Sequence, residues 1–374
     1  MSQIQEKNKK KWSKDGRSWY FACYYNNIYG ERKQKKSKLY FTKKEAKEAE
    51  IEFLKALNKE IDISDPYFID VYNEWFEYKK SKLKSTSYYS LRKRLDKHVL
   101  AYFEKYKLHS INVNNLNLWK KELHSLGNSL DHENKIIGSF KEILDYSVTE
   151  YDFNPKVANK LYKYRLESSQ RKSSAENNYW TSEEFNDFIN NVDDEYYKLM
   201  FEFLYYTGLR ISEMIALNWN DVELKNKKLN IDKTFSNKCF DENFIITDPK
   251  TKNSIRIIDL DSDLIDKLKI YYEHEKKIYG FSNQMFLFGN ARHTSYTTFK
   301  NKLDYYINIS KCKKITPHGF RHSHASLLWD LGCSIEEIAK RLGDTPRVVE
   351  ETYAHIFPKK VSHTINVLED FKKN

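Results

Sequence analysis

Cysteine is scarce in this sequence, which has four cysteines among 374 residues. They are Cys23, Cys239, Cys312 and Cys333, and no two lie close enough to form a Cys-x-x-Cys metal clip. This spacing argues against a structural zinc site. We expect the four side chains to be reduced thiols that are buried as small apolar groups.

Long apolar runs are also absent. No stretch approaches the roughly 20 apolar residues that a membrane span requires, and the chain begins with polar and basic residues, unlike a signal peptide. The sequence contains no metal-binding cluster, no phosphate-binding loop and no internal repeat. We therefore expect a cytoplasmic protein that contacts no membrane and requires no metal or nucleotide cofactor.

Positive charge is plentiful and unevenly distributed. The net charge is +11, and the first 60 residues contribute +8 of it, with 14 Lys and 2 Arg against 8 acidic residues. A local basic excess attracts polyanions, and nucleic acid is the usual partner of such a segment. A solvated lysine-rich surface is the alternative, and charge alone does not decide between them.

The length and the local patterns predict a multidomain, mainly α-helical protein with small sheets. Residues 1–60 predict a three-stranded sheet followed by a helix. The signals are turns at Asp15-Gly16 and Asn26–Gly30, alternating Trp19, Phe21 and Tyr25, a basic strand over Glu31–Leu39, and a capping box of Thr42 and Glu45 that opens a helix to about Lys59. The sheet's aromatic side chains either pack on the helix or face a DNA groove, and we expect both, on different faces.

Residues 63–165 predict a helical domain, because apolar side chains such as Tyr72 and Trp75 recur at helical spacing. Lysines and arginines gather near its first two helices, where they either grip phosphates or form an ordinary solvated face. The polar, serine-containing stretch 166–179 predicts an interdomain linker. We expect residues 180–374 to form an α+β domain.

Four segments of the last domain carry the chemistry: Tyr206–Met214, Asp248–Arg256, Pro317–His324, and Leu342–Asp344 with Glu351–His355. In the first segment, a glycine turn precedes a short helix that places Arg210 and Glu213 on one face. The second segment, with Lys250 and Lys252 at its polar tip, predicts a β-hairpin.

Two arginines, a lysine, histidines and a late tyrosine together suit phosphoryl transfer. The planar fork of arginine matches the nonbridging oxygens of a phosphodiester, tyrosine can be a covalent nucleophile, and lysine and histidine can move protons. Each signal is weak alone. Tyr353 is one of 28 tyrosines, and His318 with His322 has the spacing of a metal pair but lacks the glutamate of a zinc protease. The order and spacing of all four segments carry the interpretation.

These segments resemble the catalytic domain of the tyrosine recombinase, or phage-type integrase, family. TGLRISE, HGFRHSHAS and ETYAH are similar to its three most recognisable motifs, and PKTKNSIR is similar to the segment that bears its lysine. The resemblance covers about residues 176–374. The two upstream segments resemble, more weakly, the family's helical core-binding domain and its arm-type DNA-binding domain.

The resemblance implies a role for each matching residue. Arg210 and Arg321 would clamp the scissile phosphate of the DNA, and Glu213 would support Arg210. Lys250 would protonate the departing 5′ hydroxyl, with Lys252 as the competing candidate for this role.

The remaining roles concern the nucleophile and its neighbours. Tyr353 would attack the phosphate and form a 3′-phosphotyrosyl bond, while His318 would assist proton transfer there. The covalent bond would conserve the energy of each cut, so that neither ATP nor a metal is needed. His322 and His324 receive no assured role from the resemblance.

Asp344 departs from the family pattern, which usually has His or Trp after Leu-Gly. An ionised carboxylate cannot donate a hydrogen bond to a phosphate and would be repelled by it. Asp344-Thr345-Pro346 has the form of a helix start, with the cap at Asp344 or Thr345. We expect Asp344 to be structural, holding the helix that delivers Tyr353 and accepting a hydrogen bond from a nearby His or Arg.

The resemblance also implies partners. Four protomers would form a homotetramer on double-stranded DNA, act at core and arm attachment sites, and exchange strands through a Holliday junction to integrate and excise a mobile element. A directionality factor or a host DNA-bending protein would be a further partner. The segment His363–Asn374 would dock on a neighbouring protomer or pack on its own domain.

The main alternative function is a noncatalytic helix-turn-helix DNA-binding regulator. Ser334–Gly343 resembles the first half of such a motif, but the following segment carries Glu350 and Glu351, which would repel phosphates. This alternative also leaves Arg210 and Arg321 unexplained. A type IB topoisomerase would use similar chemistry, but the three-segment layout with a basic N-terminal sheet favours an integrase.

Overall fold

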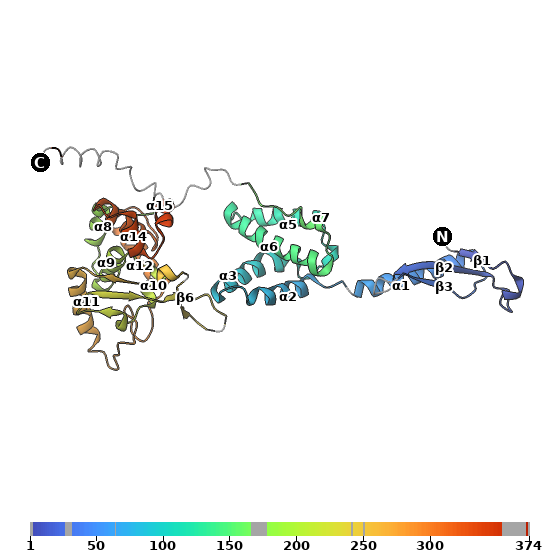
Figure 1. Cartoon of the computed structure of the whole chain (residues 1–374), viewed down its shortest axis with the longest axis horizontal. Coiled ribbons are helices and arrows are strands. Elements are labelled where there is room, and N and C mark those ends of the chain that lie inside the picture. The colour runs from blue at the N-terminus through green and yellow to red at the C-terminus, as the bar shows by residue number, and fades with distance from the viewer. Residues whose placement is uncertain are drawn as a thin grey trace. The chain divides into compact units, whose positions relative to one another are not determined.

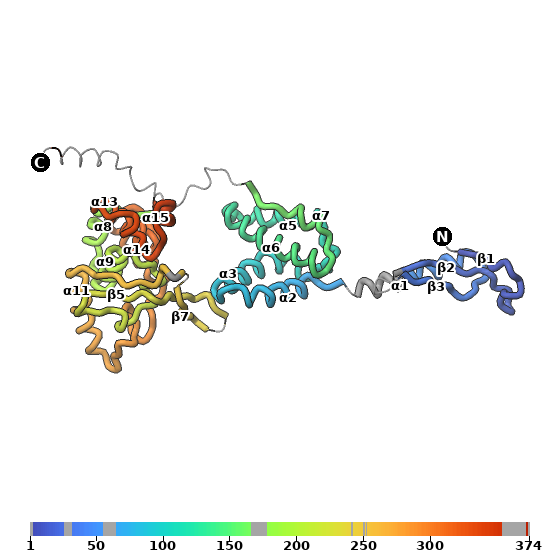
Figure 2. The backbone as a smooth tube through the Cα atoms, in the orientation of Figure 1, coloured from blue at the N-terminus to red at the C-terminus, as the bar shows by residue number. Residues whose placement is uncertain are grey.

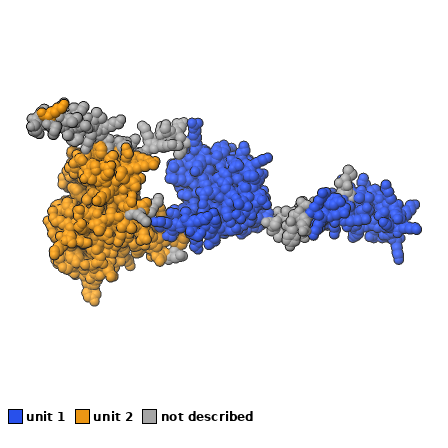
Figure 3. All heavy atoms as spheres, viewed as in Figure 1, with its two compact units in different colours: residues 1–165 blue, residues 166–374 orange. Residues whose placement is uncertain are grey.

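A computed structural model describes residues 3–26, 32–63, 65–165, 178–240, 242–249, 251–353 and 372. The chain divides into two compact units, residues 1–165 and residues 166–374, which Figure 3 shows in two colours. Figures 1 and 2 trace the helices and strands of each unit.

The first unit begins with a three-stranded antiparallel sheet and a helix. The strands, in spatial order, are β1 (Gln3–Gln5), β2 (Trp19–Asn26) and β3 (Arg32–Lys36), and the helix is α1 (Lys43–Ile63). Phe21 and Tyr25 of β2 pack against Phe53 of α1, with ring centroids 6.0 and 5.4 Å apart. On the opposite face of β2, the rings of Tyr20 and Tyr24 lie under side-chain cations of β3. The predicted sheet and helix are confirmed, as is the expected packing of aromatic side chains on the helix. The tyrosines on the opposite face are stacked under cations, and their contact with a DNA groove stays a prediction.

The rest of the first unit is a helical bundle, as predicted. Its helices are α2 (Phe68–Lys80), α3 (Ser85–Leu95), α4 (Ala101–Phe103), α5 (Val113–Ser125), α6 (Leu130–Tyr151) and α7 (Pro155–Ala158), with a π-helical turn at Asp96–Leu100 and a 3₁₀ turn at Leu108–Ser110. Large aromatic residues fill the centre, where the ring centroids of Phe103 and Trp119 lie 5.1 and 4.9 Å from that of Phe140. Because these rings are buried, the bundle has its own hydrophobic core.

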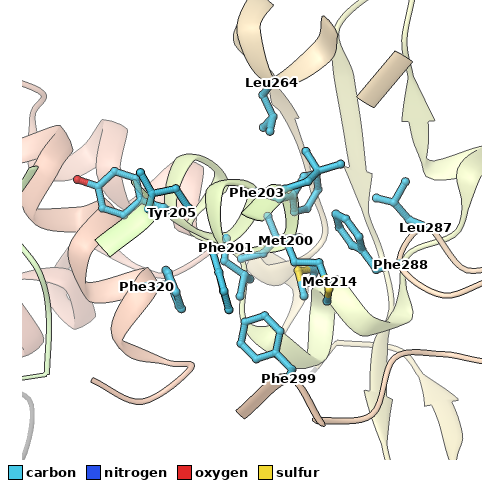
Figure 4. Packing of buried hydrophobic residues seen from close by; sticks show 14 of the residues in the cluster. Met200, Phe201, Phe203, Tyr205, Met214, Leu264, Leu287, Phe288, Phe299 and Phe320 are labelled. Atoms are coloured by element: carbon cyan, nitrogen blue, oxygen red, sulfur yellow. The ribbon is translucent and has the colours of Figure 1, made fainter. Parts of the chain in front are cut away.

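The second unit has a larger core built around one central helix. Its helices are α8 (Ser182–Ile189), α9 (Glu195–Thr207), α10 (Ile211–Ala216), α11 (Ser262–Glu275), α12 (Tyr296–Ser310), α13 (Gly319–Asp330), α14 (Ile335–Leu342) and α15 (Pro346–Tyr353). Helix α9 is apolar on most of its surface, so α8, α11 and α13 can all pack against it. Figure 4 shows Phe201 of α9 beside Phe299 and Phe320, with ring centroids 5.3 and 5.8 Å from it. This core fixes the ends of α9 and α13, where the candidate site lies.

Two small antiparallel sheets complete the second unit. One has the order β4 (Val222–Glu223), β5 (Lys228–Ile231), β8 (Arg256–Asp259), and the other pairs β6 (Thr234–Ser236) with β7 (Ile245–Thr247). The β-hairpin predicted for Asp248–Arg256 is therefore wrong. The segment runs from β7 in one sheet to β8 in the other, with a 3₁₀ turn at Lys252–Ser254. The alternating apolar residues of β8 pair with β5, a partner that the local sequence does not reveal.

The four cysteines are free and half-buried, so the expected reduced thiols are less buried than predicted. Within the described part of the chain, no helix is long and apolar enough to cross a membrane. The same residues contain no group of three or more His, Cys, Asp or Glu side chains placed to hold a metal ion.

Candidate active site

Arg210 is positioned by the sharp end of α9. Gly208 ends this helix with φ of 66°, and a Cβ atom added there would lie 2.4 Å from Cδ2 of His324, so this turn requires glycine. Arg210 then precedes α10, where Glu213 accepts hydrogen bonds from its backbone N–H at 3.0 Å and from its Nη1 at 2.9 Å. Glu213 is thus in direct contact with Arg210 through two hydrogen bonds, as its predicted supporting role requires.

Arg321 lies in the first turn of α13, and its side chain is only 1% exposed. Its Nη1 donates to the carbonyl oxygen of Gly208 at 2.9 Å, and its Nη2 donates to that of Leu342 at 2.8 Å. These carbonyls belong to the C-terminal ends of α9 and α14, which otherwise lack hydrogen-bond partners and carry partial negative charge. The guanidinium therefore joins three helices and is held in one orientation.

Asp344 bridges the two arginines. Its Oδ1 accepts from Nη2 of Arg210 at 2.7 Å, and its Oδ2 accepts a short hydrogen bond from Nη2 of Arg321. Burial opposes ionisation of the carboxyl group, but Arg321 and Arg210 lower the pKa of Asp344 below its usual value. The expected hydrogen bond from a neighbouring arginine is present twice.

Thr345, the other candidate, caps the start of α15. Thr345 Oγ1 accepts from the N–H of Val348 at 3.3 Å, whereas the Asp344 N–H donates to the carbonyl of Ala339 at 3.0 Å and so closes α14. The side chain of Asp344 therefore serves the arginines rather than the helix start.

Arg256 is a residue of this site that the sequence reasoning missed. Its Nη2 donates to Glu213 Oε2 at 3.0 Å, its Nη1 to the carbonyl of Ser254 at 3.0 Å, and its Nε to the carbonyl of Arg341 at 2.8 Å. The sequence did contain a signal for a buried position, because Arg256 lies on the same inward-facing side of β8 as Ile258. A charged residue at a buried strand position requires a buried partner.

We call Arg210, Arg256, Arg321, Glu213 and Asp344 the charged cluster. Burial raises the pKa of Glu213, but the adjacent Arg256 and Arg210 outweigh this and lower it below the usual value. Three arginines against two ionised carboxylates leave one excess positive charge. A cluster with buried walls and one excess positive charge is suited to hold an anion.

Tyr353 lies at the end of α15 and is 2% exposed. Its ring centroid is 5.3 Å from that of His322, which is 4.7 Å from that of His318. Burial raises the pKa of Tyr353, while the cation of Arg321 acts in the opposite direction. Partial burial, together with Arg321 and Arg210, lowers the pKa of His318, although the residue as a whole is exposed. At neutral pH His318 is therefore uncharged and able to accept a proton.

His324 is a structural residue in this arrangement. It is fully buried, its Nδ1 lies 2.8 Å from the carbonyl oxygen of Tyr205, and its Nε2 accepts from Nε of Arg341 at 3.0 Å. Burial lowers the pKa of His324 to about 3, so the ring stays neutral. Its contact with Gly208 makes it part of the turn that presents Arg210.

Several sequence predictions fall outside what the structure describes. The predicted linker 166–179 is described only at residues 178 and 179, and the predicted turn at Asn26–Gly30 only at Asn26. Lys250 lies outside the described residues, as does the side chain of Lys252. The segment His363–Asn374 is described only at Lys372. Arg210, Glu213, Arg321 and Asp344 are in direct contact, and Tyr353 and His318 lie close to them.

Comparison with family models assigns most of the chain. Residues 178–360 match the phage integrase family, residues 8–57 match an arm DNA-binding domain, and residues 67–124 match the N-terminal SAM-like domain of phage integrases. These matches exclude a noncatalytic regulator. The helix pair α14 and α15 does form a local helix-turn-helix, but its second helix buries Tyr353 at the charged cluster.

Relatives match over nearly the whole chain. The ICEBs1 integrase of Bacillus subtilis (strain 168) is 28% identical over 343 residues, which are 88% of this chain and 90% of that protein. The integrase of Staphylococcus phage L54a is 27% identical and covers 77% of this chain and 88% of its own length.

Solved structures share the fold. The Tn1549 transposon integrase in complex with a circular intermediate DNA superposes with a TM-score of 0.62 at 16% identity, covering 82% of this chain and 99% of that one. A lambda integrase dimer bound to a COC′ core site superposes with a TM-score of 0.53 at 12% identity, covering 76% and 94% of the two chains.

Proposed function

We propose that this chain, which belongs to the phage integrase family and is a site-specific tyrosine recombinase, integrates and excises a mobile element. The observation that carries the catalytic assignment is the convergence of Arg210 before α10, Arg321 of α13 and Tyr353 of α15 on one largely buried cluster with excess positive charge. The names of the relatives, an ICEBs1 integrase and a phage integrase, support the mobile-element role.

In the proposed reaction, the Tyr353 oxygen attacks the scissile phosphorus and the bond to the 5′ oxygen breaks. Arg210 and Arg321 neutralise the charge that develops on the nonbridging oxygens, which is where electrostatic catalysis acts most strongly. His318 accepts the phenolic proton, and Lys250, or in its place Lys252, protonates the departing 5′ oxygen. Attack of a 5′ hydroxyl from the partner strand on the 3′-phosphotyrosyl bond reverses these steps and releases Tyr353.

The wider assembly is part of the same proposal. Residues 1–60 bind arm sites, residues 63–165 bind core sites, the stretch 166–179 links them to the catalytic domain 180–374, and four protomers act together on DNA in the cytoplasm. Complexes of the Tn1549 and lambda integrases with DNA support DNA as the substrate. A directionality factor or a host DNA-bending protein joins this assembly, and the segment His363–Asn374 docks on a neighbouring protomer or on its own domain.

A joining assay tests the function. Two linear DNAs that carry the element's attachment sites are incubated with the full chain in excess chelator and without nucleotide, and recombinant joints are scored beside relaxation of a supercoiled plasmid. We expect joints in chelator. Relaxation without joining would indicate a topoisomerase, and strict dependence on magnesium would contradict the proposed chemistry.

A further inference from the structure

Asp344 occupies the place in the charged cluster where an anionic substrate would bind. Each of its two carboxylate oxygens accepts a hydrogen bond from one arginine: Oδ1 accepts from Arg210 at 2.7 Å, and Oδ2 accepts from Arg321. A carboxylate offers two oxygens that share one negative charge, as does a phosphodiester through its nonbridging oxygens. The contact thus has the charge and the two-oxygen form of the contact expected for the substrate.

The hydrogen-bond capacity of Arg321 makes the two anions competitors. Each Nη atom carries two N–H groups, and those of Arg321 Nη2 are directed to the carbonyl of Leu342 and to Asp344. Arg210 makes one printed contact from each Nη atom, Nη1 to Glu213 and Nη2 to Asp344. The competition therefore arises at Arg321, where a phosphate that binds Nη2 must take the place of the carboxylate, and like charges at this spacing repel.

We propose that Asp344 is a resident anion of the phosphate site, which keeps Arg210 and Arg321 paired in the DNA-free protein and yields to the scissile phosphate. This inference rests on the proposed function, because it takes the arginine pair as the phosphate clamp. Asp344 is then a positioning residue. It stabilises the arginines against their mutual repulsion before DNA arrives, and it weakens phosphate binding by the free energy of the contacts that are exchanged.

A thermal experiment tests the DNA-free state with inorganic phosphate as the probe. Asp344→Asn should lower the Tm of the free chain, because the arginines lose their shared carboxylate. Added phosphate should then raise the Tm of Asp344→Asn more than that of the wild type, since only the variant offers an unfilled site. Glu350→Gln, which removes one exposed charge from α15, is the matched control and should respond to phosphate as the wild type does.

A DNA-binding experiment tests the exchange itself. In the Tyr353→Phe background, which prevents cleavage, the affinity for a core site is compared with that for the same duplex lacking only the scissile phosphate. Asp344→Asn should tighten binding of the intact site about tenfold, the worth of one charge-assisted hydrogen bond, and leave the phosphate-free duplex unchanged. Asp344→His provides a second variant if Asp344→Asn folds poorly, and the same phosphate-specific gain is expected.

Three results would overturn the inference. They are equal tightening on both duplexes, no tightening with either variant, and a collapse of cleavage by Asp344→Asn at unchanged Tm, which would show that the carboxylate takes part in the reaction. Covalent adduct formation by the wild type on a nicked core site is measured in parallel. Without that adduct the proposed function itself fails, whereas an adduct without phosphate-specific tightening removes only the inference about Asp344.

Discussion

The charged cluster and the N-terminal sheet both present cations, but they hold them in opposite ways. In the cluster, Arg321 and Arg256 have side chains only 1% and 6% exposed, and each makes at least three hydrogen bonds. In the sheet, every residue of β3 is exposed, and Arg32 and Lys36 lie over the rings of Tyr24 and Tyr20 at 4.6 and 4.2 Å.

The difference shows how one kind of charge serves two purposes. A buried arginine whose contacts are all fixed keeps one geometry at a reacting atom, and losing it leaves partners buried without compensation. An exposed cation stacked on a tyrosine can follow a DNA backbone, and its neighbours share its task. Single substitutions should therefore be severe in the cluster and graded in the sheet.

The largest effect is expected at Arg256. Arg256→Gln leaves the carboxylate of Glu213 short of a cation and frees the carbonyl of Arg341, so the free energy of unfolding should fall by about 3 kcal/mol, as for a broken buried ion pair. Chemical denaturation measures this. The exposed Arg347, paired with Glu351 on α15, is the control, and Arg347→Gln should change stability little. Similar losses in the two variants would remove the distinction between buried and exposed cations.

An intermediate effect is expected at His324, whose protonation should make the free energy of unfolding depend on pH. Its folded-state pKa of about 3 lies below the ordinary value of 6.5, so the unfolded chain binds the proton more readily. The stabilisation is complete above pH 6.5 and is lost as the pH falls toward 3, at about 1.4 kcal/mol per pH unit. Stability curves of the wild type and His324→Gln between pH 7 and 5 should differ in slope by about one proton. Parallel curves for the wild type and His324→Gln would refute the assignment.

The smallest effect is expected on the sheet. Lys36→Gln removes one exposed cation, so affinity for arm-site DNA should fall modestly and the dependence of log affinity on log salt should become shallower by about one unit. Removal of the whole segment 1–60, in contrast to the single change, should abolish arm binding while core-site cleavage persists at least in part. A single lysine change that abolished arm binding would show that the sheet, like the cluster, depends on one fixed contact.

How far the sequence could predict this structure differs between the same two regions. The sheet and α1 follow from local signals, because strand alternation and the Thr42 capping box act over a few residues. The cluster depends on contacts across the chain. Arg210 and Arg321 were predicted by motif, but their link through Asp344 joins residues 134 and 23 positions apart.

The errors have the same physical origin. The partner strand of β8 is β5 rather than β7, a long-range pairing that alternation along β8 does not specify. The inward parity of Arg256 signals a buried partner but does not identify Glu213. Thr345 and Asp344 are both good helix caps, and only the position of the arginines draws Asp344 away from that task.

The most direct test of the central claim follows the covalent bond to Tyr353. A nicked core site that traps the cut product is incubated with the wild type and with Tyr353→Phe, and the protein–DNA adduct is digested and sequenced by mass spectrometry. We expect the wild-type adduct to map to Tyr353 through a 3′ phosphate, and Tyr353→Phe to bind DNA normally but form no adduct. An adduct on another residue, or one that persists in Tyr353→Phe, would contradict the assignment.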